Sequence, residues 1–163
     1  MHTPRLPLLT VFGLGRLRPA RGTWGSMPPI VIAGLLIALG FGPAEAPVIY
    51  IGTLVAVMLF FSAACIAQGD VAEAVFGKKD HGNIVADETA GQCVTLLPFA
   101  LLPAAAFATP ATTMFTLIFA FLAFRAMDIA KPWPANGFQK LPAGWGVLID
   151  DLLAGGYAFL IML

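Results

Sequence analysis

The chain has 163 residues, of which 59% are apolar and 11% charged, with nine basic and nine acidic side chains. Soluble domains carry about a quarter charged residues, so this composition excludes a disordered tail, nucleic-acid binding through bulk basicity and most soluble enzymes. The length predicts one domain, 1–163, whose first ten residues or so we expect to be flexible.

Uncharged stretches, taken in chain order, predict the helices. Residues 22–44, 46–69 and 89–124 carry no charge, and a bilayer-spanning helix needs about 20 apolar residues. The third stretch is too long for one helix and contains prolines that predict a turn near residue 110. Because period-two alternation is absent, we expect an all-α, membrane-embedded bundle of about four or five apolar helices. The expected helices are 28–42, 48–67, 92–108, 111–127 and 147–163.

The later predicted helices are short. Interfacial or re-entrant placements therefore remain open for them.

Basic residues fall on one side of this arrangement. If the N-terminus is cytoplasmic, all nine lysines and arginines lie on the inner side, and only Glu45 among the acidic residues lies on the other. The positive-inside rule then predicts an N-in, C-out protein whose chemistry lies at the cytoplasmic face. Residues 6–14 lack the core and cleavage site of a signal peptide. Cys65 and Cys93 show neither metal nor disulfide spacing, so we expect them to be packing residues.

Four polar segments interrupt the apolar pattern. The first, 22–26, precedes a helix that we expect Pro28 and Pro29 to open. Backbone amides at such an entrance suit a phosphate group, although an ordinary turn and cap fits the same residues. In the second segment, Asp87 and Glu88 directly precede an apolar run. They fit either favourable charge in a helix first turn or a pair of oxygen ligands for a divalent cation.

In the third segment, Arg125, Asp128 and Lys131 recur every three residues and so share a helical face. They fit an ion-pair ladder or a cradle for phosphate and metal. In the fourth, Asp150 and Asp151 enter an apolar helix, where at least one should point into a polar cluster. Carboxylates crowded on one side of a membrane repel one another unless cations hold them, so a magnesium site is the economical explanation.

Two sets of candidate site residues follow, and together they suggest phosphate chemistry on a lipid. The acidic set is Glu73, Asp80, Asp87, Glu88, Asp128, Asp150 and Asp151. The anion-binding set is Arg125, Lys131 and the backbone amides of Gly22, Thr23, Gly25 and Ser26.

The four segments resemble the motifs of the phosphatidylglycerophosphatase A family. The resemblance rests on residues 22–26, 79–92, 124–134 and 149–155, in that order, and it covers nearly the whole chain from about residue 11. Two positions depart from the pattern. Arg21 stands where a proline is expected, which bears on the rigidity of the phosphate loop, and Ala135 stands where a larger apolar residue is usual.

The resemblance implies a magnesium-dependent lipid phosphatase of the bacterial inner membrane, with its active site on the cytoplasmic side. Such enzymes convert phosphatidylglycerophosphate to phosphatidylglycerol and inorganic phosphate, so the implied partners are this phospholipid and the membrane, not nucleic acid. The family's basic motif positions match Arg125 and Lys131. Its acidic motif positions match the catalytic candidates Asp80, Asp87, Glu88, Asp128, Asp150 and Asp151. Magnesium is then expected to be held by Asp87, Glu88 and one or more of Asp128, Asp150 and Asp151.

Several alternatives stay open. In the mechanism, one carboxylate either activates water or attacks phosphorus itself. The sequence lacks a Cys-x5-Arg loop, which excludes a cysteine phosphatase. It also lacks an Asp-x-Asp pair, which disfavours the common aspartate-phosphatase scheme. A small transporter or assembly factor would be expected to carry ionisable residues in mid-span. The motif of CDP-alcohol phosphotransferases is absent from the sequence. A different lipid phosphomonoester is a further candidate substrate, because the sequence does not reveal a headgroup pocket.

Overall fold

The structure is a computed structural model that describes residues 6–78, 81–133 and 143–163. Over these residues it consists of helices and turns, which confirms the all-α prediction. The elements in order are η1 (Val11–Arg16), α1 (Arg21–Ala38), α2 (Pro47–Phe76), α3 (Ala86–Leu96), η2 (Leu97–Leu101), η3 (Ala104–Phe107), α4 (Pro110–Ala130) and α6 (Ala143–Met162).

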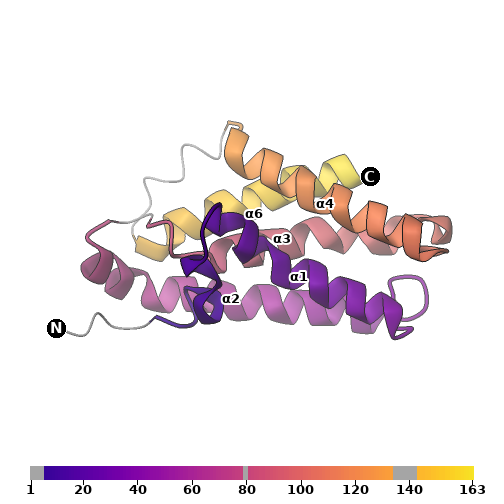
Figure 1. Cartoon of the computed structure of the whole chain (residues 1–163), viewed down its shortest axis with the longest axis horizontal. Helices are drawn as coiled ribbons and strands as arrows, with labels where there is room; N and C mark the ends of the chain where they lie inside the picture. The colour runs from indigo at the N-terminus through magenta and orange to yellow at the C-terminus, as the bar shows by residue number, and fades with distance from the viewer. Residues whose placement is uncertain (1–5, 79–80, 134–142) are drawn as a thin grey trace.

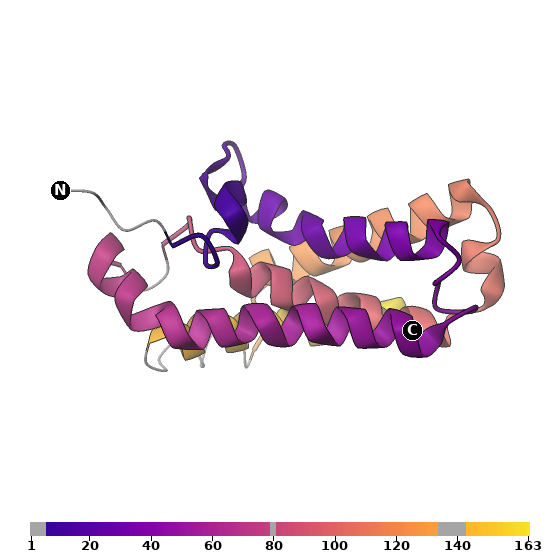
Figure 2. The same cartoon turned by 90° about the horizontal axis from the view of Figure 1, so that it is seen from below.

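The helices run side by side along the long axis of the molecule (Figures 1 and 2). α1, α3 and α6 begin at the end that holds the N-terminal segment, and α2 and α4 finish there (Figure 1). We call this end, formed by three helix starts and two helix ends, the polar end. α3 lies inside the bundle, where it packs against α1, α2, α4 and α6. All four predicted polar segments are therefore brought to one end of the molecule.

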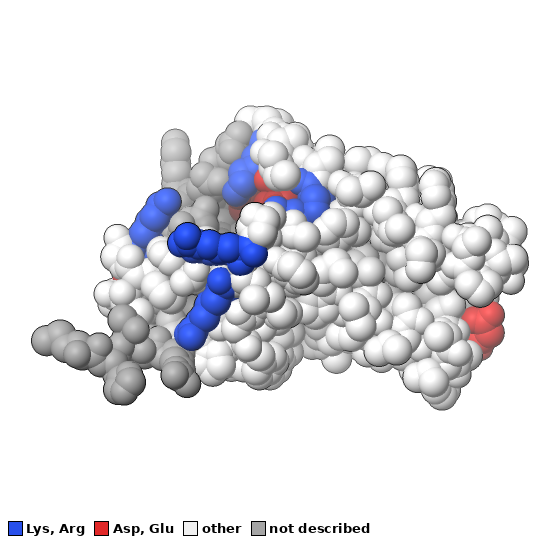
Figure 3. Space-filling model, viewed as in Figure 1, with Lys and Arg blue, Asp and Glu red and all other residues white. Residues whose placement is uncertain are grey.

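Three helices in the described part of the chain are long and apolar enough to cross a membrane: α2, α4 and, within α6, Gly144–Met162. Exposed apolar side chains cover α4, including Met114, Phe115 and Leu122. An apolar surface of this extent indicates membrane association. On the face seen in Figure 3, charged atoms gather toward the polar end, apart from one acidic group at the far end.

Two predicted helices need correction. The predicted helix 28–42 instead begins at Arg21 and encloses Pro28 and Pro29. The predicted helix 92–108 is wrong, because α3 covers Ala86–Leu96 and two 3-10 turns follow it. Pro98 and Pro103 explain the break, since proline lacks an N–H group and clashes with the preceding helical turn. Neither α1 nor α3 is among the candidate spans, and α3 with its two turns fits the re-entrant alternative.

The other predicted helices are confirmed, with shifted ends. The helix predicted at 48–67 continues as α2 to Phe76, where Gly77 ends it in the left-handed region with φ 65°. The helices predicted at 111–127 and 147–163 correspond to Pro110–Ala130 and Ala143–Met162. The extra length of α2 carries it past the apolar run into the polar end.

The segment before η1 fixes the start of α3. The carbonyl of Leu9 accepts hydrogen bonds from the backbone N–H groups of Val85, at 2.9 Å, and Ala86, at 3.2 Å. Leu9 itself is buried and packs in the same core cluster as Val85. These contacts satisfy amides that a helix start leaves unpaired, and they hold Asp87 and Glu88 in the first turn of α3. Residues 6–9 thus pack against the bundle, while residues 1–5 lie outside the described part of the chain.

Two glycines allow α3 and α6 to touch through their backbones. A Cβ atom on Gly155 would overlap the carbonyl of Gly91, and one on Gly91 would overlap the carbonyl of Asp151 and lie 2.7 Å from the ring of Phe124. This close approach brings the acidic pair of α6 beside the polar start of α3.

Candidate active site

The start of α1 is joined to α3 by a hydrogen bond that the sequence of α1 makes necessary. Pro29 has no N–H group to donate to the carbonyl of Gly25, four residues earlier. The hydroxyl of Thr89 donates to that carbonyl instead, at 2.6 Å. Thr89 and Pro29 are both buried. The two helices are therefore held together at the polar end.

Glycines on the same face of α1 admit charged side chains from two other helices. A Cβ atom on Gly22 would lie 2.6 and 2.8 Å from the two terminal nitrogens of Arg125 and would overlap Oε1 of Glu88. A Cβ atom on Gly25 would lie 2.6 Å from Oε2 of Glu88. The sequence thus uses glycine where the carboxylate and the guanidinium meet the helix backbone.

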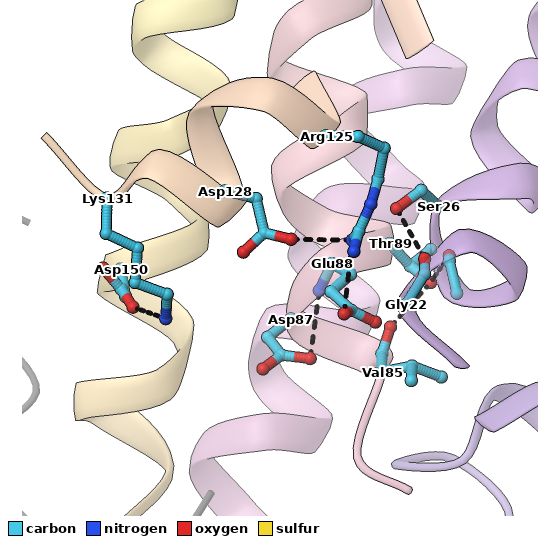
Figure 4. A network of polar contacts seen from close by, with 11 residues as sticks. Gly22, Ser26, Val85, Asp87, Glu88, Thr89, Arg125, Asp128, Lys131 and Asp150 are labelled. Atoms are coloured by element: carbon cyan, nitrogen blue, oxygen red, sulfur yellow. Dashed lines mark hydrogen bonds and ion pairs between the residues drawn. The ribbon is translucent and has the colours of Figure 1, made fainter. Parts of the chain in front are cut away.

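Arg125 connects the carboxylates of two helices (Figure 4). Its Nη1 atom lies 3.4 Å from Oε1 of Glu88 in α3 and 2.7 Å from Oδ2 of Asp128, one turn further along α4. The predicted shared face of Arg125 and Asp128 is confirmed. Lys131 does not extend this ladder, because its Nζ atom pairs with Oδ2 of Asp150 in α6.

Lys131 ends α4 in a left-handed conformation with φ 43°. An L-residue adopts this region at a cost of roughly 1–2 kcal/mol, and the ion pair with buried Asp150 is the interaction gained. Burial disfavours the charged amine, but the hydrogen bond to Asp150 and the negative charges of Asp150, Asp151 and Asp128 raise the pKa of Lys131. The site therefore keeps a positive charge at this position.

Five acidic side chains gather at the polar end. Asp87, Asp128, Asp150 and Asp151 are all less than 9% exposed, and Glu88 lies against Gly22 and Gly25. Burial, followed by the charges of Asp87 and Asp128, raises the pKa of Glu88 well above its ordinary value, although Arg125 acts in the opposite direction. In the described part of the chain, Arg125 pairs with Glu88 and Asp128, and Lys131 pairs with Asp150.

In the described residues, no three His, Cys, Asp or Glu side chains are arranged as they stand to hold a metal ion. Arg125 occupies the position between Glu88 and Asp128. Two features nevertheless fit a hard divalent cation. Oε2 of Glu88 is buried and has no hydrogen-bond partner within the described part of the chain, and the donors of the cluster are carboxylate oxygens, which magnesium prefers. The set that fits is Asp87, Glu88, Asp128, Asp150 and Asp151.

The predicted phosphate loop is wrong in its local structure, because Gly22, Thr23, Gly25 and Ser26 all lie within α1. Ser26 donates its hydroxyl to the carbonyl of Gly22 at 2.8 Å, and the amides of Gly25 and Ser26 lie beyond the first turn, whose amides alone lack partners within a helix. The prolines that were expected to open the helix are tolerated inside it because Thr89 supplies the missing donor. The Thr23 amide donates to the Ala20 carbonyl at 3.0 Å, so of these four amides only that of Gly22 keeps the predicted place at the helix entrance.

The remaining candidates separate into two groups. Glu73 is exposed on α2, away from the contacts that define the cluster. Asp80 and Ala135 lie outside the described residues. The predicted functional roles of all these side chains stay predictions.

Thr89 and Gln92 were missed by the sequence reasoning. Gln92 is fully buried, and neither atom of its amide has a hydrogen-bond partner among the described residues. It lies one helical turn beyond Glu88 on the same face of α3. That four-residue spacing, within an otherwise apolar run, is the signal that could have identified it.

Comparisons with known proteins identify the family of the chain. The family described as Phosphatidylglycerophosphatase A matches residues 8–163. A relative of that name from Haemophilus influenzae is 34% identical, covering 93% of this chain and 82% of the relative. One from Escherichia coli is 30% identical, covering 95% and 79%. A third, from Bacteroides thetaiotaomicron, carries a provisional name as a phosphatidylinositol-3-phosphatase and is 32% identical, covering 96% and 91%. No solved structure gives a significant match.

Proposed function

The chain belongs to the phosphatidylglycerophosphatase A family, and we propose that this phosphatase hydrolyses phosphatidylglycerophosphate to phosphatidylglycerol and inorganic phosphate. One observation carries the proposal. Gly22 of α1, Glu88 of α3 and the Arg125–Asp128 pair of α4 meet at one point of the polar end. A buried cluster that combines cations with carboxylates suits a phosphomonoester, which needs both charge neutralisation and proton transfer.

The cations neutralise the phosphoryl group. Arg125 is oriented by Glu88 and Asp128, and Lys131 by Asp150, so both stay in place before a substrate arrives. Oriented donors of this kind stabilise the charge on the phosphoryl oxygens without reorganising during the reaction. The start of α1 adds the amide of Gly22 and the positive end of a helix dipole.

The carboxylates take part in the displacement. Water attacks phosphorus and a carboxylate accepts the proton that water loses; the bond from phosphorus to the glycerol oxygen breaks, and that oxygen takes up a proton to leave as the alcohol. A carboxylate that attacks phosphorus itself is the second scheme, and hydrolysis of the resulting acyl phosphate would complete it. Asp87, Asp128, Asp150 and Asp151 are the buried candidates for these steps.

We propose magnesium as the cofactor, held by Asp87, Glu88 and one or more of Asp128, Asp150 and Asp151. When bound, it would polarise a phosphoryl oxygen. The burial of these carboxylates and the unpartnered Oε2 atom of Glu88 support this assignment.

Phosphate release by the purified protein in detergent tests reaction and substrate together. We expect release from phosphatidylglycerophosphate with magnesium and none with excess chelator. Undiminished release with chelator would overturn the magnesium site. The Bacteroides relative makes phosphatidylinositol-3-phosphate the natural competitor, and a clear preference for it would overturn the substrate assignment while leaving the phosphatase chemistry intact.

The proposed location is a bacterial inner membrane, with the polar end at the cytoplasmic face. The positive-inside rule supports it, because Arg16, Arg125 and Lys131 all lie at the polar end. A reporter inserted near Lys78 should be cytoplasmic and one fused at Leu163 periplasmic. The reverse result would invert the proposed orientation, while two cytoplasmic reporters would mean that α6 does not cross.

A further inference from the structure

The face of α1 that points away from the carboxylate cluster carries an apolar groove. Its volume is about 410 Å³, and it is lined by Leu14 of η1 and by Trp24, Met27, Pro28, Val31 and Ile32 of α1. The volume falls within the roughly 300–1,000 Å³ of small-molecule sites. Gly22, Gly25 and Ser26 face the other way: the two glycines meet Glu88, and Ser26 is fully buried. The groove is therefore separate from the active site.

Cations lie at the polar end of this groove. The chain between Leu14 and Trp24 carries Arg16 and Arg18, which are exposed, and Arg21, whose guanidinium lies beside Gly82. In the described part of the chain the salt bridges are made by Arg125 and Lys131 instead. Arg16 and Arg18 follow Leu14 of the groove lining by two and four residues and are exposed, so they are placed to meet an anionic group.

The length of the groove along α1 is close to the hydrocarbon thickness of one bilayer leaflet. Trp24 and Ile32 are separated by about 12 Å along α1, at the helical rise of 1.5 Å per residue. Half of the hydrocarbon core is about 15 Å thick. Trp24, which is 39% exposed, stands at the polar end of the groove, at the level where tryptophan favours the membrane–water interface. A chain lying in the groove would thus have the length of an acyl tail.

The loop that carries the cations has further interfacial character. Phe12 is 74% exposed and Leu17 42% exposed, so apolar side chains alternate with the arginines. Phe12 adopts the left-handed region with φ 55°, a strained conformation that holds its ring outward. Apolar and cationic groups in one exposed segment are typical of surfaces that bind anionic lipids.

We propose that this groove binds an anionic phospholipid other than the substrate, with an acyl chain along α1 and its phosphate against the arginines of the loop. The bound lipid would contact η1 through Leu14. Since the chain just before η1 caps α3 through the Leu9 carbonyl, occupation of the groove should stabilise the whole polar end. Phosphodiester lipids of this kind need no hydrolysis to bind, so the inference does not depend on the proposed reaction.

The test compares two lipids on delipidated protein in a neutral detergent. Phosphatidylserine is anionic and is neither the proposed substrate nor its product, and phosphatidylcholine carries no net charge. Binding is measured by native mass spectrometry and by the shift of the thermal unfolding midpoint. We expect phosphatidylserine to bind at least tenfold more tightly and to raise the midpoint in a saturable way.

Matched variants separate a specific site from bulk lipid. The double substitution R16Q/R18Q and the groove-filling V31W should each weaken phosphatidylserine binding at least tenfold. K78Q removes an exposed lysine of the polar end outside the groove, and L122W enlarges an exposed side chain of α4; both should leave binding unchanged. Equal affinity for the two lipids would overturn the proposal, and so would phosphatidylserine binding that neither R16Q/R18Q nor V31W weakens.

Discussion

Gly22 offers a substitution whose effect on the site can be worked out in advance. In Gly22→Ala, the new Cβ atom would lie 2.6 and 2.8 Å from the terminal nitrogens of Arg125 and would overlap Oε1 of Glu88. The atoms that must move are the ends of two side chains, so the helix itself can stay in place. The guanidinium would be displaced from the position in which Glu88 and Asp128 hold it.

Stability and activity should respond differently to this change. Alanine gains about 1 kcal/mol over glycine inside a helix, and overpacking costs typically 1–3 kcal/mol, so the net loss of unfolding free energy should be below about 2 kcal/mol. Displacement of one oriented charge donor costs roughly 100- to 1,000-fold in turnover. We therefore expect Gly22→Ala to fold and to lose about two orders of magnitude in phosphate release.

Gly34 provides the matched control on the same helix. A Cβ atom there would lie 3.4 Å from Cδ1 of Leu117, an ordinary contact. Gly34→Ala should keep full activity and gain up to about 1 kcal/mol of stability. Both variants are assayed for phosphate release and for thermal unfolding in detergent. If Gly22→Ala keeps activity within a few-fold, or if Gly34→Ala loses as much, the geometry assigned to Arg125 is refuted.

Two further substitutions test other parts of the structure. Asp128→Asn should fold and lose phosphatase activity by orders of magnitude, because it removes the charge that holds Arg125 and that a hard cation requires. Asp70→Asn, at an exposed position of α2, is its control. Equal, mild losses of activity in the two variants would contradict the assignment of Asp128 to the site. Gly155→Ala should lower the unfolding free energy by about 1–3 kcal/mol, because its Cβ would overlap the Gly91 carbonyl. At the adjacent Gly156, a Cβ atom would meet nothing within 4 Å, so Gly156→Ala should not be destabilised in thermal unfolding. Equal losses of stability in the two variants would contradict the proposed α3–α6 contact.

Long-range features of the fold were predictable from the sequence, since charge and hydropathy act over whole helices. The apolar runs of α2, α4 and α6 are long enough to span a membrane. The polar segments could meet at one end because successive helices reverse direction. The shared face of Arg125 and Asp128 followed from a three-residue spacing alone.

Local features that depend on a partner elsewhere in the chain were not predictable. The pairing of Lys131 with Asp150 joins α4 to α6, and spacing within α4 suggested Asp128 instead. Likewise, α3 packs against four other helices, and nothing in the composition of residues 86–108 indicates those contacts. The short length of α3 could therefore not be predicted from this segment alone. The start of α1 shows this most clearly. Two consecutive prolines normally end or open a helix, yet Pro28 and Pro29 lie inside α1.

That case leads to a test of how α1 and α3 are coupled. The Gly25 carbonyl loses its helical donor to Pro29 and receives the Thr89 hydroxyl instead, at 2.6 Å. In Thr89→Val, a side chain of nearly the same shape cannot donate, so the buried carbonyl is left unpaired at a cost of about 1–3 kcal/mol. Pro29→Ala restores an N–H group four residues after Gly25. The loss caused by Thr89→Val should therefore shrink by more than about 1 kcal/mol in the Pro29→Ala background.

Equilibrium unfolding of the four proteins of this cycle gives the coupling free energy directly. Thr53→Val is the control, because the exposed Thr53 hydroxyl donates at 2.8 Å to the Ile49 carbonyl within its own helix. No proline removes a backbone N–H donor from that carbonyl. Its effect should stay within about 0.5 kcal/mol. Additive effects of Thr89→Val and Pro29→Ala, within about 0.5 kcal/mol, would mean that the hydroxyl does not replace the lost donor. The tolerance of α1 for its prolines would then need a different cause.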